Sequence, residues 1–156
     1  MQYSEPRHLY ASPTNPFVAG FIGAMNFLPD CRRMDGQSIR FLDYHLDTVA
    51  DLSVDSIECM LAIRPEHIRA ATDTADANRI GVRVHSVEFR GSVSRIRMQV
   101  LYASGALSAH YLEMDLQSKA VEQLKPDIGR HLDIHLPVNH LLAFHDAEQE
   151  RREYAA

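Results

Sequence analysis

The residues best placed for nucleophilic chemistry are two serines, Ser92 and Ser94, in the run Gly91-Ser92-Val93-Ser94. A hydrolase serine commonly sits in a Gly-x-Ser-x-Gly turn, which exposes its hydroxyl between a strand and a helix. This run lacks the second glycine, and Arg90-Gly91 in front of it is typical of a hairpin turn. The pattern therefore predicts a turn rather than a catalytic serine.

Nine histidines raise the question of a metal site. His131 and His135 share one face of a predicted strand, but at ~3.3 Å per residue they lie about 13 Å apart. A single Zn²⁺ ion needs ligand atoms about 2.1 Å away, so these two do not chelate it together. The tighter cluster Asp43-x-His45-x-Asp47 fits the solvent face of a strand equally well. No Cys-x-x-Cys or His-Glu-x-x-His spacing is present, and we predict no metal site.

Charged residues gather between positions 88 and 115. Glu113 and Asp115 share a strand face, and paired carboxylates can act in acid–base catalysis, although such residues are usually exposed. A further set of arginines and aromatic residues fits the binding of single-stranded nucleic acid, namely Arg90, Arg95 and Arg97 with Phe89, Tyr102 and Tyr111. The formal net charge of −5 argues against a nucleic-acid binder that relies on a basic field. We expect neither catalysis nor nucleic-acid binding from this region.

Length and composition narrow the class of protein. The 156 residues fit one domain or two very small ones, and the chain is long enough to fold without a metal or disulfide. Cys31 and Cys59 suit a reduced cytosolic setting, where cysteine acts as a small buried hydrophobe. The sequence contains no run of about 18 apolar residues, which is the length that would predict a membrane span. The start of the chain lacks the apolar core of a signal peptide.

Residues 15–23 predict a short capped helix that leads into an apolar strand. Asn15 is a good N-cap, and Pro16 fits the first helical position. Gly23 is a natural stop for the helix. The apolar residues recur on one side of it, namely Phe17, Val18, Phe21 and Ile22. A helix of about two turns does not persist alone, so this stripe must pack on something larger.

Two short runs have two interpretations each. Alternation predicts Met25 and Phe27 in the core of the first strand with Asn26 outward, and the alternative is that the three form a contact surface for a neighbouring domain. Arg64 and Glu66 flank a proline at a strand end. As a local ion pair on an exposed rim they would contribute under about 1 kcal/mol. The alternative, which the family resemblance described below implies, is a turn that braces the barrel and faces a partner subunit.

Most of the remaining chain predicts strands with apolar residues at every second position. The alternating sets are Ile39 and Phe41; Ile57, Cys59, Leu61 and Ile63; Ile96, Met98, Val100 and Tyr102; and Leu132, Ile134 and Leu136. Val82 and Val84 lie on one parity, and Val87 and Phe89 lie on the other. A β-bulge near residues 85–86 reconciles the two parities and bends the strand.

Turn signals between these strands favour antiparallel pairing: Asp35-Gly36, Arg90-Gly91-Ser92 and Ala103-Ser104-Gly105. Short helices are expected at 48–52 and 118–124. Many short strands and few helices predict an all-β barrel or sandwich. Residues 1–145 form either one domain or two small halves, about 24–69 and 80–145, joined by the polar linker 70–78. Residues 146–156 form a charged tail.

Four runs resemble one known family, in the order in which that family has them. They are Leu9-Tyr10 through Pro29; Ile63-Arg64-Pro65-Glu66-His67-Ile68; Val87-Glu88-Phe89-Arg90-Gly91-Ser92 with the strand 95–98; and Leu124-Lys125-Pro126 with Gly129, Leu136-Pro137 and 141–144. Together they resemble the C-terminal regulatory region of ABC importer ATP-binding subunits of the maltose, polyamine and ferric-ion type. That region contains the transport-associated oligonucleotide-binding-fold (TOBE) domain. The resemblance covers about residues 7–145.

The resemblance implies an OB-fold-like (TOBE- or MOP-like) small barrel or pair of barrels with a short N-terminal helix and one or two further short helices. It implies a non-catalytic regulatory and dimerisation domain in the cytoplasm, peripheral on the inner face of the plasma membrane without inserting into it. The implied partners are its own ATPase core, the membrane subunits of the transporter and a second copy. The interface candidates are Phe17, Phe21, Met25, Asn26, Phe27, Arg64 and Glu66.

The ATPase motifs of that family are missing from this sequence. There is no Gly-x₄-Gly-Lys-Ser/Thr loop to hold phosphates, and Leu52-Ser53-Val54 does not continue into a Leu-Ser-Gly-Gly-Gln signature. We therefore expect no ATP hydrolysis and no cofactor in this chain, whereas ATP and Mg²⁺ serve the parent subunit. Ala24-Met25 stands where maltose-type members have Ser-Pro, which moves the likeness toward the polyamine, phosphonate and iron types.

An alternative within the same transporter type is the sensing of a small ligand. Related small barrels bind molybdate-like anions, and an oxyanion or the transported solute would be held by backbone N–H groups and hydroxyls. Ser92 and Ser94 are the candidate ligand contacts. The resemblance therefore leaves two functions open, a contact domain and a ligand sensor.

Overall fold

The computed structural model describes residues 24–35, 37–49, 58–73 and 76–145. The helix predicted at 15–23, with Phe17 and Phe21, lies outside these residues, and so do the charged tail 146–156 and most of the helix predicted at 48–52. The described chain is mostly β-strand, which confirms the predicted all-β class.

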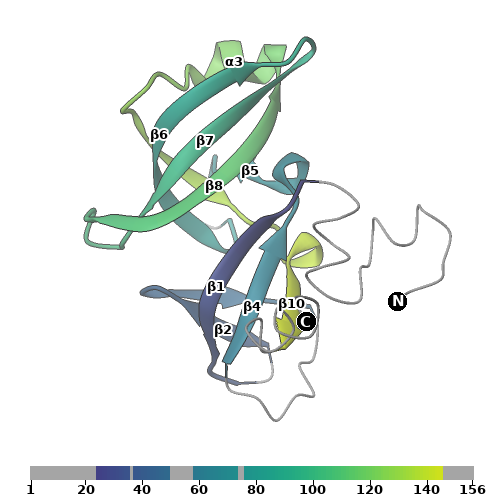
Figure 1. The fold of residues 1–156 in the computed structure, drawn as a ribbon, viewed down its shortest axis with the longest axis vertical. Coiled ribbons are helices and arrows are strands. Elements are labelled where there is room, and N and C mark those ends of the chain that lie inside the picture. Colours follow the sequence, from purple (N-terminus) through teal and green to yellow (C-terminus); the bar gives the residue numbers. More distant parts are fainter. Residues whose placement is uncertain (1–23, 36, 50–57, 74–75, 146–156) are drawn as a thin grey trace, which may run out of the picture.

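Two five-stranded antiparallel sheets, one above the other, make up the described fold (Figure 1). The strand order is β10-β4-β1-β2-β3 in sheet A and β5-β9-β6-β7-β8 in sheet B. The strands of sheet A are β1 (Asn26–Arg33), β2 (Ser38–Phe41), β3 (Tyr44–Asp47), β4 (Glu58–Ile63) and β10 (Leu142–His145). Those of sheet B are β5 (Arg69–Ala70), β6 (Arg79–Phe89), β7 (Val93–Leu101), β8 (Leu107–Gln117) and β9 (His131–His135). The short helices are η1 (Pro65–His67), α3 (Ser118–Leu124) and η2 (Val138–His140), and α3 confirms the helix predicted at 118–124.

Each sheet takes one strand from the part of the chain that builds the other sheet. β10, near the end of the described chain, pairs with β4 in sheet A, beginning at Leu142 opposite Ala62. β5 follows the strands of sheet A but pairs with β9 in sheet B, with Arg69 opposite His135. The sheets therefore cannot separate without breaking these ladders. The extents of two halves at about 24–69 and 80–145 stay predictions.

Local turn chemistry sets the hairpin connections. The Asp35 carboxylate accepts hydrogen bonds from the N–H groups of Gln37 and Ser38 at 3.1 and 2.9 Å, which closes the β1–β2 turn. In the β6–β7 turn Gly91 has φ 82°, a left-handed conformation that glycine adopts without strain. The bulge predicted in β6 is confirmed, because its register with β7 shifts between Val84 and Ser86.

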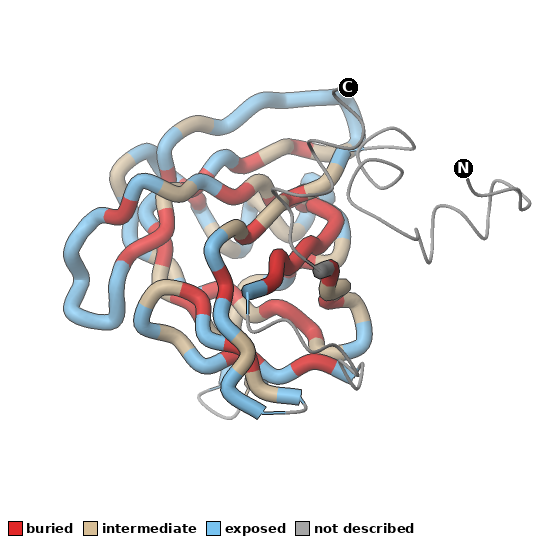
Figure 2. The backbone as a smooth tube through the Cα atoms, turned by 60° about the horizontal axis from the view of Figure 1, so that its bottom comes forward, coloured by how far each residue is buried: buried red, intermediate tan, exposed pale blue. Residues whose placement is uncertain are grey.

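One apolar core takes residues from both sheets (Figure 2). Its fully buried members include Leu28, Ile39 and Leu61 from sheet A and Val82, Ile96 and Met98 from sheet B. The alternation predicted for 57–63 is wrong as a pattern of exposure, because Met60 and Ala62 are as buried as Leu61. β4 lies between β10 and β1, and Phe144 of β10 packs on Ala62 on the face away from the main core. A strand covered on both faces loses its two-residue pattern.

The two cysteines lie opposite each other in the β1–β4 ladder. Cys31 and Cys59 are both buried free thiols, which fits the prediction that they act as small hydrophobes. Burial raises the pKa of Cys31 to about 12 and the pKa of Cys59 to about 11. At neutral pH both side chains therefore stay protonated and unreactive.

Tyr44 of β3 joins the two sheets through its hydroxyl. The hydroxyl donates to the carbonyl of Leu101 in β7 and accepts from the N–H of Gly81 in β6 at 3.2 Å. The β6–β7 ladder in this direction ends at the pair of Val82 and Val100, so the hydroxyl bridges the two strands one residue beyond it. Burial raises the pKa of Tyr44, which keeps the hydroxyl able to donate.

Tyr44→Phe is expected to lower the free energy of unfolding by about 1–3 kcal/mol, because the Gly81 N–H and the Leu101 carbonyl both lose a partner. Urea unfolding followed by circular dichroism measures the change. Tyr102→Phe is the matched control, since Tyr102 is 38% exposed. Equal midpoints for the two variants would contradict a linking role for the Tyr44 hydroxyl.

Candidate functional site

Asn26, the first residue of β1, binds the edge of the opposite sheet. Its side-chain Nδ2 donates to the Glu113 carbonyl at 2.8 Å, and its Oδ1 accepts from the Glu113 N–H at 2.7 Å. The amide thus pairs with β8 as a residue of a neighbouring strand would. Asn26 is only 7% exposed, so the prediction that it faces outward is wrong. This side of β1 is turned toward sheet B, where the buried amide finds two backbone partners.

Asn78, directly before β6, makes the reciprocal contact with sheet A. Its Oδ1 accepts from the Asp47 N–H at 2.7 Å, and its Nδ2 donates to the Asp47 carbonyl at 2.8 Å. Nδ2 also donates to the Leu136 carbonyl at 3.0 Å. Asn78 is 7% exposed and has φ 53°, a conformation that asparagine tolerates better than most residues.

The two asparagines cap the outer strands of the two sheets. β8 and β3 are edge strands, and an open edge offers unpaired N–H and C=O groups to other chains. Asn26 caps β8 and Asn78 caps β3, so each sheet supplies the cap of the other. The sequence pattern assigned no role to Asn78. Its signal was an asparagine at the start of an apolar alternating strand, the position that Asn26 also holds.

Arg64 lies at the end of β4 inside the molecule. It is 3% exposed, and its Nη1 lies 3.4 Å from the Ala24 carbonyl, to which it donates. Burial lowers the pKa of Arg64. Glu66, on η1, is exposed. An ion pair on an exposed rim is therefore a wrong description of Arg64, which instead braces the backbone just before β1.

Two stacked histidines join η1 and η2. The ring centroids of His67 and His140 lie 3.9 Å apart, with 17° between the ring planes. Burial lowers the pKa of His67, and the charges of His140, Arg64 and Arg69 act in the same direction. Two neutral rings stack without repulsion, whereas protonation places a charge in this half-buried contact. The contact between η1 and η2 therefore depends on pH.

A small apolar cluster covers part of the outward face of sheet A. Met25 and Phe27 are half-buried there and pack with Leu142 against the buried Ala62 and Phe144. We call these five residues the apolar face. The prediction placed Met25 and Phe27 in the core. This is wrong for the core between the sheets, because both side chains lie on the face of sheet A that points away from sheet B.

Ser92 and Ser94 stand in different surroundings. Ser92 is exposed in the β6–β7 turn, and its carbonyl accepts from the N–H of Ser118 at the start of α3. Ser94 is 6% exposed and lies opposite Phe89 in the β6–β7 ladder. A single ligand would have to reach one exposed and one buried hydroxyl, which the turn does not favour.

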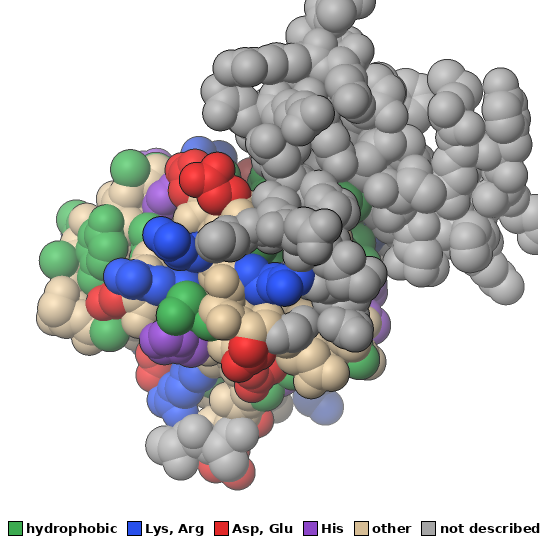
Figure 3. All heavy atoms as spheres, turned by 90° about the horizontal axis from the view of Figure 1, so that it is seen from below, with side chains coloured by type: hydrophobic (Ala, Val, Ile, Leu, Met, Phe, Trp, Pro, Cys, Tyr) green, Lys and Arg blue, Asp and Glu red, His purple; other side chains and the backbone are tan. Residues whose placement is uncertain are grey.

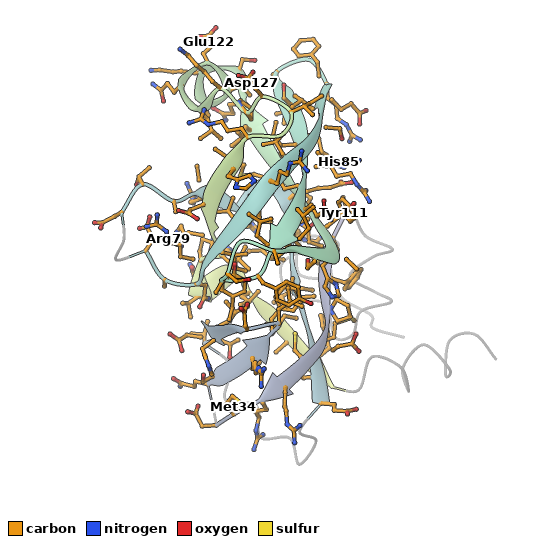
Figure 4. All side chains as sticks on the ribbon, turned by 90° about the vertical axis from the view of Figure 1, so that its left-hand side faces the viewer. Met34, Arg79, His85, Tyr111, Glu122 and Asp127 are labelled. Atoms are coloured by element: carbon orange, nitrogen blue, oxygen red, sulfur yellow. The ribbon has the colours of Figure 1, made fainter. Side chains whose placement is uncertain are left out.

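The arginines that suggested nucleic-acid contact are neutralised by carboxylates. The ion pairs are Arg90 with Glu88, Arg95 with Asp115, and Arg97 with Glu113. The Arg97 guanidinium also lies 4.8 Å from the ring centroid of Tyr111. Figure 4 shows Tyr111 near His85 on this face, and their ring centroids are 5.3 Å apart. These three arginines therefore offer little free positive charge to a phosphate backbone.

The described residues contain no cluster of three His, Cys, Asp or Glu side chains that could hold a metal ion. A groove of about 450 Å³ lies between Tyr44 of β3 and the neighbouring parts of sheet B. Two of its charged side chains, Arg79 and Asp133, form a salt bridge of 2.6 Å. The positive charge of Arg79 and the negative charge of Asp133 therefore offset each other in the lining of this groove.

Residues 61–144, more than half of the 156, match the family model described as the TOBE domain. The chain belongs to the TOBE-domain family. The match begins inside β4 and ends in β10, so it covers η1, all of sheet B and the last strand of sheet A. The residues of this TOBE domain that match the family model therefore lie in both sheets.

The curated relatives are import ATP-binding proteins. This TOBE domain is 28% identical over 106 residues to the spermidine/putrescine protein PotA of Thermobifida fusca, covering 64% of this chain and 28% of that protein. It is 35% identical over 99 residues to the sulfate/thiosulfate protein CysA 2 of Chromobacterium violaceum, covering 63% and 26%. It is 30% identical over 152 residues to the maltose/maltodextrin protein MalK of Vibrio parahaemolyticus, covering 92% and 38%. The chain thus spans well under half the length of these relatives.

A solved structure has the same fold. The crystal structure of the cytoplasmic molybdate-binding protein ModG, with molybdate bound, superposes with a TM-score of 0.58 at 11% identity. The superposition covers 79% of this chain and 96% of that one. At this identity the likeness concerns the fold alone, and it confirms the OB-fold-like prediction. Among the described residues, no helix is long and apolar enough to cross a membrane.

Asn26→Asp is expected to lower the free energy of unfolding by about 1–3 kcal/mol, because a carboxylate replaces the donor that faces the Glu113 carbonyl. Asn139→Asp, an exposed asparagine on η2, introduces the same charge and should change stability by under about 0.5 kcal/mol. Urea midpoints measure both. Identical midpoints would show that the Asn26 amide does not hold the sheets together.

The stacked histidines predict a pH dependence of stability. Because the pKa of His67 is lowered in the folded state, the unfolded chain binds more protons once the pH falls toward the ordinary histidine pKa. Stability should therefore decrease between about pH 7.5 and about pH 5.5, and His67→Gln should flatten that part of the profile. Melting temperatures at each pH measure it, with the exposed His131→Gln as the control. A His67→Gln profile as steep as that of wild type would refute the assignment.

Proposed function

We propose that this TOBE domain is the regulatory and dimerisation part of an ABC importer ATP-binding subunit, and that it acts by contact rather than by catalysis. The observation that carries the proposal is the family match over residues 61–144, together with relatives that are all import ATP-binding proteins. On this proposal the domain works on the cytoplasmic side of a membrane, beside the membrane subunits of a transporter.

The apolar face is the proposed contact with the ATPase core. Met25 and Phe27 on this face directly follow the stretch 15–23, whose apolar stripe includes Phe17 and Phe21. Half-buried apolar side chains still gain free energy from a partner that completes their burial, in proportion to the apolar area that is removed from water. Arg64 supports the position of this face, because it holds the backbone at Ala24.

The junction between the sheets suits a domain that transmits movement. Two exchanged strands, two asparagine amides and the Tyr44 hydroxyl tie the sheets together. Two sheets joined in this way move as one rigid unit, so a displacement of one sheet by a partner also displaces the other sheet. We propose that it touches its symmetry mate, using the same patch on both copies, and keeps two ATPase cores associated while they open.

Sensing of a small ligand is the second candidate function. The ModG structure has molybdate bound, but its likeness to this chain extends to the fold only. The surroundings of Ser92 and Ser94 differ, one exposed and one buried, and this difference does not favour a shared ligand. The contact function is therefore the better supported of the two.

A chimera tests the contact function. Residues 1–156 replace the matching region of the Thermobifida fusca spermidine/putrescine protein, and the chimera is expected to sediment as a dimer and to hydrolyse ATP. Phe27→Asp in the chimera should lower the ATPase rate, because a carboxylate in the apolar contact with the ATPase core is not solvated. Val49→Asp is the matched control, since Val49 is 62% exposed and outside the apolar face.

Circular dichroism of the isolated chain shows first that Phe27→Asp still folds. A folded chimera that stays monomeric without ATPase activity would overturn the proposed function. Equal behaviour of Phe27→Asp and Val49→Asp would overturn the placement of the contact at the apolar face.

A further inference from the structure

Two apolar residues near the end of β6 are exposed, although they lie on the inward face of sheet B. Val87 is opposite the fully buried Ile96 and Phe89 is opposite the buried Ser94, and residues opposite each other in a ladder point to the same side. Helix α3 packs against β7 and β8. At the end of β6, on the side of the molecule farthest from sheet A (Figure 1), Val87 is 41% exposed and Phe89 is 75% exposed. Two apolar side chains are thus left partly uncovered there.

The backbone of the same two residues points away from β7. The Arg90 N–H donates to the Val93 carbonyl at 2.8 Å, so these residues form a hydrogen-bonded pair next to the turn. Hydrogen-bonded and non-bonded pairs alternate along an antiparallel ladder. The N–H and carbonyl groups of Phe89 and Val87 are therefore directed to the other side of β6. On that side β9 pairs with β6 only as far as Arg83.

The last backbone partner on this side of β6 is the loop between α3 and β9. Its Gly129 N–H donates to the Val84 carbonyl at 2.8 Å, and the Val84 N–H donates to the Arg130 carbonyl at 2.9 Å. Within the described chain, no further backbone hydrogen bond reaches this side of residues 87–89. We call it the open edge. Unpaired N–H and carbonyl groups beside exposed apolar side chains are a template for another strand.

The charges at the open edge are complementary to those of a second copy of the same edge. Glu88 and Arg90 flank Phe89, and their side chains form a salt bridge of 3.2 Å while staying 64% and 45% exposed. In an antiparallel pair centred on Phe89, Glu88 of each copy lies opposite Arg90 of the other. Opposite charges facing each other across two strands stabilise their pairing. The edge is therefore self-complementary about Phe89.

A pair centred on the neighbouring residue does not fit this edge. Centred on Glu88, it puts two carboxylates opposite each other, and like charges in that position are destabilising. It also carries the second strand past Val87 toward the loop that already occupies Val84. Centred on Phe89, the second strand reaches only Val87, where it turns away at its own Gly91, which has φ 82°. Charge and space thus favour the same register.

The opposite end of the molecule is less suited to a contact between copies. Figure 3 views that end, and Lys and Arg side chains gather near its middle. In sheet A, which lies at that end, Arg32 of β1 is opposite Arg40 of β2 and both are exposed. Neither forms an ion pair with any described residue. A second copy would bring the same positive charges to this surface, and like charges across an interface oppose association.

We propose that two copies of this chain pair the open edges of β6 about a twofold axis at Phe89, so that their B sheets join into one antiparallel sheet. The Phe89 N–H of each copy donates to the Phe89 carbonyl of the other, and the two phenyl rings lie side by side on the inward face. This inference locates the symmetry contact of the proposed function and rests on that function for its role in a transporter. The contact is on sheet B, whereas the apolar face is on sheet A.

The contact is short, so the full chain should self-associate weakly. Complexes with small interfaces are typically transient. Two domains carried on one pair of ATPase cores would meet at an effective concentration in the millimolar range, so a weak contact suffices there. Sedimentation equilibrium of the full chain between about 10 µM and about 1 mM covers that range. Wild type should shift from monomer toward dimer as its concentration rises.

Phe89→Pro should weaken this self-association at least about tenfold, because proline lacks the N–H that crosses the interface and the phenyl contact is lost. The monomer should keep its fold, because the Phe89 N–H points away from β7 and no ladder hydrogen bond is removed. Circular dichroism and a urea midpoint check the fold. Val49→Pro, at an exposed residue of sheet A's end of the molecule, is the control and should associate as wild type does.

Two charge variants test the pairing itself. Glu88→Arg alone and Arg90→Glu alone should each remain monomeric, because like charges then face each other across the axis. Mixed together, the two variants should form a heterodimer, because the positive copy faces the negative copy at both flanking positions. Each variant keeps its own local structure in the mixture, so a local distortion of the strand does not produce this rescue.

The proposal is overturned if wild type stays monomeric over the whole concentration range, if Phe89→Pro associates as wild type does, or if the mixed charge variants sediment as two monomers. Binding of an alternating Val-Thr peptide by a strictly monomeric chain would also overturn it and would assign the open edge to a strand of another protein. A dimeric chimera that Phe89→Pro leaves unchanged would refute this contact alone. A chimera that is monomeric and without ATPase activity would refute the proposed function, whatever the full chain does by itself.

Discussion

Backbone groups at the open edge of a β-sheet need partners, and in this domain each sheet finds them in a buried amide of the other sheet. Asn26 completes β8 through the N–H and carbonyl of Glu113, and Asn78 completes β3 through those of Asp47. A side-chain amide has one donor end and one acceptor end, so it satisfies both groups of an edge residue at once. The arrangement occupies one residue on each of two edge strands that would otherwise invite pairing with other chains.

The same constraint explains why the two sheets behave as one body. β10 joins sheet A and β5 joins sheet B, so ladder hydrogen bonds cross between the two parts of the chain. The Tyr44 hydroxyl adds a bridge to β6 and β7, and one apolar core fills the space between the sheets. A domain that works by contact needs such stiffness, because a contact on one sheet changes nothing at the other if the sheets slide. The polar junction and the apolar face are therefore complementary parts of the proposed role.

Charge is distributed unequally over the two sheets. The arginines of β7 are held by Glu113 and Asp115, and such pairs on a partly exposed face contribute little stability but remove free positive charge. Arg32 and Arg40 of sheet A lack such described partners, although they face each other.

Local patterns in the sequence determined the strand-rich class, the bulge in β6, the hairpin turns and helix α3, because alternation, glycine and turn residues act over a few positions. The ordered motifs determined the family, which residues 61–144 confirm. Tertiary structure alone decided that Asn26 faces inward, that β4 is buried on both faces and that Arg64 is buried. Each of these depends on a distant neighbour: Asn26 and Glu113 are 87 residues apart, and Ala62 is covered by Phe144. A two-residue period in the sequence separates the side chains of a strand into two faces. Which of the two faces is exposed to water depends on the other strands that pack against it.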